Sequence, residues 1–233
     1  MATTRFTALY ATVAAVASLA LAPLLALSYF AIGEGADELR SATVAAWAQP
    51  ARELAGGLLT WASPDRVYAT YVQVFALLFP AVLLCARAAR AQRPAQTGRL
   101  ERWGWRIAFA GYRIAAAGLI AAFVVLVGGS PAGELLNVLF LALLVPGMLL
   151  SVTGSTLLGV ALLRDSYAPR LTAWLLALAV PLMLVGSDVL GHNSLGMVPL
   201  LLAWAATGRH LWQLERSTSK QRALSANQPK VAA

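Results

Sequence analysis

The sequence predicts an all-helical, polytopic integral membrane protein: a bundle of six transmembrane helices with one or two interfacial helices on the outer side. Three observations lead to this fold class. The 233 residues are 59% hydrophobic and only 12% charged, with a mean hydropathy of +0.69, whereas a soluble domain carries about 25% charged residues. Apolar stretches long enough to cross a bilayer recur along the chain. The segments between them alternate in the sign of their charge.

The six expected spans each approach or exceed the about 20 apolar residues that a transmembrane helix needs. They cover residues 7–32, 67–86, 107–128, 135–163, 171–187 and 195–212. A cleaved signal peptide is the alternative for the first span, because Ala20-Leu21-Ala22 resembles a cleavage site. Pro23 directly after that site, and the apolar residues that continue beyond it, favour an uncleaved helix.

Residues 33–63 are expected to form an outer interfacial helical loop rather than plain coil. Helical composition over 36–48 predicts a first short helix, and Pro50 at the start of 50–61 predicts a second. Trp47 and Trp61 suit the headgroup zone, where tryptophan is enriched. Both helices are therefore expected to lie on the outer membrane surface.

A basic cytoplasmic loop is predicted at 87–106, and a disordered basic tail at 215–233. Trp103 and Trp105 interleave with arginines there, which places the stretch against anionic headgroups. Arg113 lies inside the third span, where it would snorkel to the same surface or pair with Asp165 or Glu215. The predicted headgroup-binding residues are Arg99, Arg102, Arg106 and Arg113.

The charges divide between the two predicted faces. Fifteen of the 18 Lys and Arg residues fall on the inner face and seven of the ten Asp and Glu residues on the outer face, which gives +12 and −4. By the positive-inside rule, both the N- and C-termini are cytoplasmic. Together with the Arg- and Ala-rich composition, this predicts a bacterial inner (plasma) membrane protein. It also accounts for the net charge of +8 without a nucleic-acid partner.

Small residues recur every four positions along the fourth span, and prolines lie inside five spans. The small residues are Gly147, Ser151, Ser155 and Gly159. Such a stripe lets two helix backbones approach closely, either within the chain or against another membrane protein or a second copy. The prolines are Pro23, Pro80, Pro146, Pro181 and Pro199, and each is expected to kink its helix.

Polar residues within or beside the spans are the candidate ligand or ion site. They are Asp188, His192, Asn193, Asn137, Tyr68 and Gln73, and all are predicted near the outer face. A carboxylate beside an imidazole, as at Asp188 and His192, can hold a proton, bind a cation or orient a small ligand. The alternative is a hydrogen-bonded turn at the lipid surface.

The layout resembles that of the rhomboid intramembrane proteases in its six spans, inner termini and helical first outer loop. That family has a Gly-x-Ser-Gly serine near the outer end of the fourth span, where this chain has Val152-Thr153-Gly154-Ser155-Thr156. Ser151 is about 24 Å from the outer end of its span, while His192 lies at the outer end of its own. The resemblance therefore covers layout only, and the activity does not carry over.

No motif in the sequence predicts an enzyme, a metal or a cofactor. Two histidines near opposite faces do not form the axial pair of a haem, and Cys85 is the only cysteine. The expected function is that of a non-enzymatic accessory, assembly or sensing component of the membrane. The alternative is a small-solute or ion transporter with an outward-facing polar site.

Overall fold

The computed structural model describes residues 2–33, 35–94, 97–127, 138 and 140–226. Over these residues the chain is all-helical and has no strand, which confirms that part of the prediction. The elements are α1 (Ala2–Tyr29), η1 (Ala36–Arg40), α2 (Ala42–Leu54), α3 (Gly56–Leu59), α4 (Pro64–Ala76), α5 (Pro80–Ala91), α6 (Arg99–Val127), the π-helical turn η2 (Phe140–Leu144), α8 (Val145–Arg164), α9 (Arg170–Ala177), α10 (Ala179–Leu190) and α11 (Ser194–Ala226).

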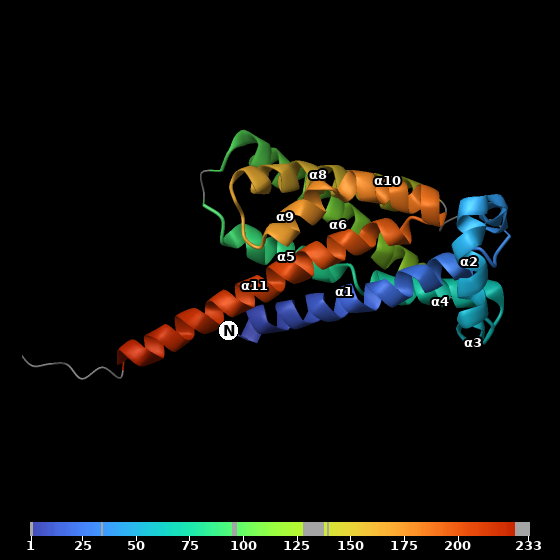
Figure 1. Ribbon diagram of the computed structural model, residues 1–233, viewed down its shortest axis with the longest axis horizontal. Coiled ribbons are helices and arrows are strands. Elements are labelled where there is room, and N and C mark those ends of the chain that lie inside the picture. Colours follow the sequence, from blue (N-terminus) through green and yellow to red (C-terminus); the bar gives the residue numbers. More distant parts are fainter. Residues whose placement is uncertain (1, 34, 95–96, 128–137, 139, 227–233) are drawn as a thin grey trace, which may run out of the picture.

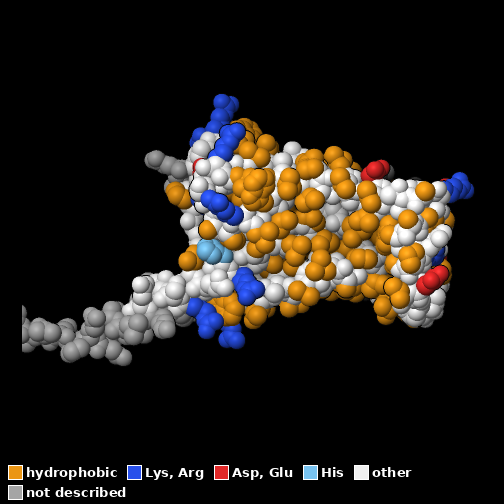
Figure 2. Space-filling model, viewed as in Figure 1, with side chains coloured by type: hydrophobic (Ala, Val, Ile, Leu, Met, Phe, Trp, Pro, Cys, Tyr) orange, Lys and Arg blue, Asp and Glu red, His pale blue; other side chains and the backbone are white. Residues whose placement is uncertain are grey.

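The long helices run side by side as one bundle, and α2 and α3 lie across one end of it (Figure 1). We call this end, which carries η1, α2 and α3, the cap end. The opposite end, where α1 begins and α5 and α8 finish, is the basic end. Figure 2 shows Lys and Arg side chains gathered mainly at the basic end, with apolar side chains covering the surface between the two ends. The cap end corresponds to the predicted outer face.

Three helical segments of the described chain are long and apolar enough to cross a membrane. They are Thr4–Tyr29, Pro64–Ala91 and Ala142–Arg164. A fourth span exists if α9 and α10, which meet at a bend of 57°, are counted as one broken span. The prediction of six spans is thus supported for three to four of them, and the full number stays a prediction.

A belt of exposed apolar side chains surrounds the bundle. On α1, Phe6, Val13 and Val16 are each more than 60% exposed, at the spacing of one helix face. Other exposed members are Leu9, Leu19, Val74, Leu77, Ile120, Leu149, Leu171, Trp174, Leu184 and Val185. A soluble protein rarely exposes so large a contiguous apolar surface, so the belt fits a lipid environment.

Glycines and serines hold α6 and α8 backbone to backbone. A Cβ atom at Gly111 or Gly154 would lie closer than 3.0 Å to backbone atoms of the other helix, and the same is true at Gly147. Ser151 and Ser155 are fully buried in this contact. In a bilayer, where lipid tails compete equally for apolar surface, such close packing is what holds helices together.

The predicted small-residue stripe is therefore used within the chain. Gly147 and Ser151 face α6, and Gly159 packs against the backbone of α9 at Ala177. These positions are already buried within one chain. Of the two alternatives, the structure therefore shows packing between helices of the same chain. Association with a second copy or another membrane protein stays a prediction, and it would have to use other surfaces.

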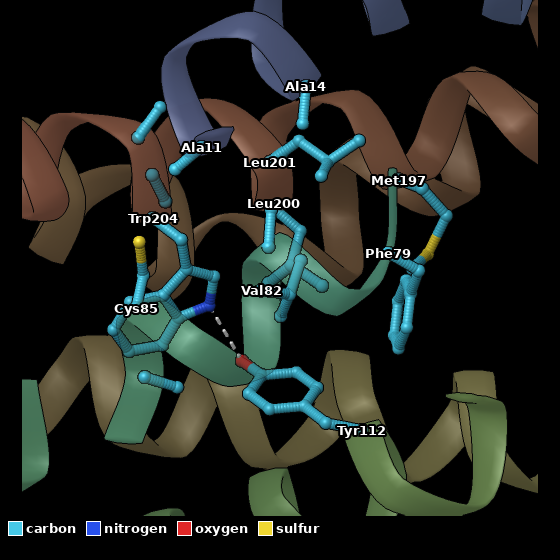
Figure 3. Close-up of a cluster of buried hydrophobic side chains, with 14 of the residues drawn as sticks. Ala11, Ala14, Phe79, Val82, Cys85, Tyr112, Met197, Leu200, Leu201 and Trp204 are labelled. Carbon is cyan, nitrogen blue, oxygen red and sulfur yellow. Dashed lines mark hydrogen bonds between the residues drawn. The ribbon is translucent and has the colours of Figure 1, made fainter. Parts of the chain in front are cut away.

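Aromatic side chains fill the centre of the bundle (Figure 3). The Trp204 ring meets the Tyr112 ring edge-on at 6.2 Å, and Trp204 Nε1 donates a hydrogen bond of 3.1 Å to Tyr112 Oη. The Tyr112 hydroxyl also lies 2.6 Å from Ser155 Oγ. Each buried polar atom in this group has a partner, so the interior remains satisfied in a low-dielectric setting.

A second, smaller core fixes the cap to the bundle. Phe30 and Leu27 at the end of α1 pack against Val44 and Ala48 of α2, and all four are almost fully buried. The ring of Trp47 meets Phe30 at 6.0 Å. The outer loop is therefore a structured element with its own apolar contacts, as predicted in outline.

Its boundaries differ from the prediction. Residues 36–40 form a short 3₁₀ helix, and α2 then continues through Pro50 to Leu54. Proline within a helix removes one backbone hydrogen bond, and the packing of Val44 and Ala48 on α1 outweighs that loss.

Two predicted inner segments also need correction. The basic stretch 87–106 is mostly helical, because α5 continues to Ala91 and α6 begins at Arg99. The tail predicted as disordered is helical from 215 to 226, since α11 runs on to Ala226. Apolar periodicity ends at Leu214, but good helix formers continue the helix without it. Residues 227–233 lie outside the described chain.

The prolines act in two ways. Pro80 and Pro146 stand in the first turn of α5 and α8, and Pro181 follows the bend between α9 and α10. Each of these three therefore accompanies a break. Pro23 and Pro199 lie inside continuous helices. Kinking was predicted for all five, and the helix is interrupted at three.

Candidate functional site

The predicted outer polar residues partly converge around Tyr29, at the cap end of α1. Its ring lies 5.7 Å from the ring of Tyr68 on α4 and 5.0 Å from that of His192 in the α10–α11 turn. The turn is made by Gly191, whose φ of +67° ends α10 in the left-handed conformation that glycine adopts without strain. Three helix ends therefore meet at one aromatic cluster, which we define as Tyr29, Tyr68 and His192.

The turn that follows α10 holds the His192 ring in place, and burial keeps the ring neutral. The backbone N–H of Ser194 donates to Nδ1 at 3.1 Å, and Ser194 Oγ donates to the carbonyl of Ala22 at 3.0 Å. The Ser194 hydroxyl oxygen also lies 2.8 Å from Nδ1. Burial lowers the pKa of His192 to about 4. The imidazole is therefore neutral at physiological pH.

The remaining predicted site residues lie outside this cluster. Asp188 is exposed and has no hydrogen bond or ion pair to any described residue. Asn193 is also exposed, and its Oδ1 accepts a hydrogen bond of 2.7 Å from Ser187. Gln73 is half-buried on α4. Asn137 lies outside the described residues. The structure thus joins Tyr68 and His192 through Tyr29, while Asp188 on α10 and Asn193 in the following turn are exposed outside the cluster.

An ionic cluster that sequence reasoning missed lies at the basic end. Arg93, in the α5–α6 connection, donates to both carboxylate oxygens of Glu101, at 2.9 and 2.7 Å, and to Asp165 at 2.7 Å. Trp105 Nε1 donates to the same Glu101 carboxylate at 3.0 Å. The Arg93 guanidinium also lies over the ring of Tyr167, 5.7 Å from its centroid. We call Arg93, Glu101 and Asp165 the basic-end clasp.

Glu101 is the buried member of the clasp, with 1% of its surface exposed. Burial would raise its pKa, but the hydrogen bonds from Arg93 and Trp105 and the charge of Arg93 outweigh burial and lower it. The same contacts raise the pKa of Arg93. Arg93 and Glu101 are therefore ionised, and the clasp joins the α5–α6 connection, α6 and the end of α8.

Two expectations change as a result. Asp165 pairs with Arg93 and not with Arg113, which is exposed and holds its guanidinium 5.8 Å from the Phe109 ring centroid. Trp105, expected on the surface, is 4% exposed and packs against Trp204. The available signal was Glu101, the single acid in an arginine-rich stretch. Its partner is eight residues away along the chain, beyond any helical spacing rule.

A groove of about 430 Å³ opens at the basic end between α1, α5 and α11. Its lining is mixed, with the apolar Leu211 and Leu214 beside polar side chains such as Gln92 and Glu215. It is distant in the fold from the aromatic cluster, which is at the cap end. The described residues contain no group of three or more His, Cys, Asp or Glu side chains that could hold a metal ion.

Comparison with known proteins adds no relative. No protein-family model, curated protein or solved structure matches this chain. The functional argument therefore rests on the geometry of the chain itself.

Proposed function

We propose that this protein is a multi-pass protein of a bacterial inner membrane that acts as a non-enzymatic accessory, assembly or sensing component. Its outer cap is the surface that binds a membrane-protein partner. One observation carries this proposal. The cap is held rigidly by its own core, yet it presents Leu54, Leu58 and Trp61 at 92%, 55% and 51% exposure. A rigid element with exposed apolar side chains is suited to recognition.

The six-span topology is part of the proposal. Tyr29 and Tyr68 flank the predicted outer loop 33–63, and they meet His192 from a second predicted outer turn. Arg93 and Glu101 of the predicted inner loop 87–106 meet Asp165 of a second predicted inner turn. Each helix or helix pair between these two meeting points runs from one end of the bundle to the other (Figure 1). This alternation supports six crossings with both termini on the cytoplasmic side.

The packed interior supports a binding role over catalysis. Between the two ends, α6 and α8 touch through their backbones, and aromatic rings fill the centre (Figure 3). Ser155, which lies in the segment compared with the rhomboid serine motif, is hydrogen-bonded to Tyr112. Side chains free to contact another molecule lie at the two ends of the bundle and in the lipid-facing belt.

Site-specific photo-crosslinking tests the partner surface. A benzophenone amino acid replaces Leu54 or Leu58 in the cap, and the cells are irradiated. The control replaces Leu184, which is 64% exposed on α10 in the apolar belt. We expect a discrete protein adduct of one mass from both cap positions and none of that mass from Leu184. Absence of a protein adduct from the cap, or the same adducts from all three positions, would refute partner binding by the cap.

A transporter is the second candidate, because the spans are broken in a way that transporters use. The α9–α10 pair bends by 57°, and the π-helical turn η2 precedes Pro146. Such breaks free backbone carbonyls that can line a pathway. Flux of small ions and solutes into proteoliposomes tests this, with Asp188→Asn and His192→Ala as variants. If flux is observed and neither substitution changes it, the assignment of the outer polar residues as a transport site is wrong.

A further inference from the structure

Four arginines form a single stripe on the lipid-facing side of α6. At 100° per residue, Arg99, Arg102, Arg106 and Arg113 fall within an arc of about 60°. All four are exposed. On the same face Ala110 lies between Arg106 and Arg113, and Ala117 and Ile120 continue toward the cap end; all three are exposed and apolar. We call these seven residues the arginine stripe and its apolar extension.

Aromatic rings hold two of these arginines in place. The Arg106 guanidinium lies 5.6 Å from the centroid of Trp103, and that of Arg113 lies 5.8 Å from Phe109. Side chains on a helix tilt toward its N-terminus, and the N-terminus of α6 is at the basic end. Both guanidinium groups are therefore directed toward the headgroup region, and cation–π contact fixes them there.

The positive charge of the stripe has no counter-charge within the described chain. None of its four arginines makes an ion pair there. The acid on this part of α6, Glu101, is turned inward and neutralised by Arg93. Arg99 and Arg102 also stand in the first turn of α6, where the helix dipole disfavours cations. An anion bound along the stripe would supply the missing counter-charge.

We infer that the arginine stripe is a stoichiometric binding site for one anionic phospholipid of the leaflet at the basic end. The phosphate lies between Arg106 and Arg113, and an acyl chain follows Ala117 and Ile120 toward the cap end. A free phosphate would explain the arginines but not the apolar extension, which points to a lipid. The inference rests on the proposed membrane placement, but it does not depend on partner binding by the cap.

Native mass spectrometry of the detergent-purified protein tests this site. The probes are phosphatidylglycerol and phosphatidylcholine with identical acyl chains. The test variant is Arg106→Ala with Arg113→Ala. The matched control is Arg164→Ala with Arg170→Ala, which removes the same charge from exposed positions at the same end. We expect the wild type to bind phosphatidylglycerol in preference, as a single adduct, and the test variant to lose affinity about tenfold. The control should retain it.

Two results would overturn the inference. Equal losses in the test and control variants would show diffuse attraction to the basic end. Equal binding of both lipids by the wild type would show that no anion site exists. The four substituted arginines have no ion-pair partner among the described residues, so the variants should elute as the wild type does. Arg113→Ala against Arg164→Ala gives the same comparison with one charge removed. The crosslinking outcome at the cap is independent of either result.

Discussion

A buried carboxylate is costly unless it is paired, and both oxygens of Glu101 are paired. Arg93 reaches both of them, and Trp105 bonds one. Such groups contribute little over an apolar replacement, but removing one partner leaves an uncompensated charge. His192 shows the opposite case, a ring kept neutral by burial. The stability of the fold therefore depends on the protonation state of one side chain at each end of the bundle.

Glu101→Gln should destabilise the protein by about 3 kcal/mol, because Arg93 keeps only Asp165 as a counter-charge. Thermal unfolding in detergent, followed by size-exclusion elution, measures this change. The matched control is Asp37→Asn, which breaks the ion pair between Asp37 and Arg40. The side chains of these two residues are 75% and 83% exposed, respectively. That change should alter stability by less than about 1 kcal/mol. Equal effects would contradict the importance of burial at Glu101.

The pH dependence of stability should carry the signature of His192. Its folded-state pKa of about 4 lies below the ordinary value of 6.5, so the unfolded chain binds the proton more readily. The resulting stability is fully present above about pH 6.5 and is lost as the pH falls toward 4. Melting temperatures at pH 7.5 and 5.0 should therefore differ in the wild type. In His192→Gln the difference should shrink, and an unchanged difference would exclude this origin.

At the scale of elements, helix contacts follow the size of side chains more closely than their hydrophobicity. Alanines line the buried face of α1, and Gly208 of α11 would place a Cβ atom 3.3 Å from Ala8. The interleaved glycines of α6 and α8 bring the backbones of those two helices even closer together. In lipid, where apolar surface gains little by pairing, proximity of backbones decides which helices associate.

Gly111→Ala should strongly destabilise the α6–α8 pair. The new Cβ would lie closer than 3.0 Å to the backbone of Ser151, which cannot move as a flexible side chain can. We expect a loss of about 3 kcal/mol, measured as a lower melting temperature and a lower yield of folded protein. Gly186→Ala is the control, since its Cβ would have no neighbour nearer than 3.6 Å. There, a gain of up to about 1 kcal/mol is expected from helix propensity.

At the scale of the whole molecule, charged side chains gather at the two ends of the bundle and apolar side chains cover the surface between them. Figure 2 shows the apolar belt between a basic end and the cap. The 33 residues of α11 extend about 50 Å, longer than the about 30 Å hydrocarbon core. Its last turns therefore project beyond the basic end, as Figure 1 shows.

Cysteine labelling tests the placement of these ends. In a Cys85→Ala background, single cysteines replace Ser41 beside the cap or Ser217 on the projecting part of α11, both of which are exposed. A membrane-impermeant maleimide should label the Ser41→Cys protein in cells with intact inner membranes. The Ser217→Cys protein should react only after those membranes are permeabilised. Labelling of both in intact cells would contradict six spans with inner termini.

The apolar belt, the all-helical class and the gathering of arginines at one end follow from composition and periodicity, which depend on neighbouring residues in the chain. The sequence alone also placed the small-residue stripe on α8 and the structured outer loop. Only the tertiary structure decided which helix the stripe meets, and that Tyr29 brings Tyr68 and His192 together. It likewise paired Arg93 with Asp165, 72 residues away. Contacts between distant residues depend on how whole helices pack, and no local pattern encodes that.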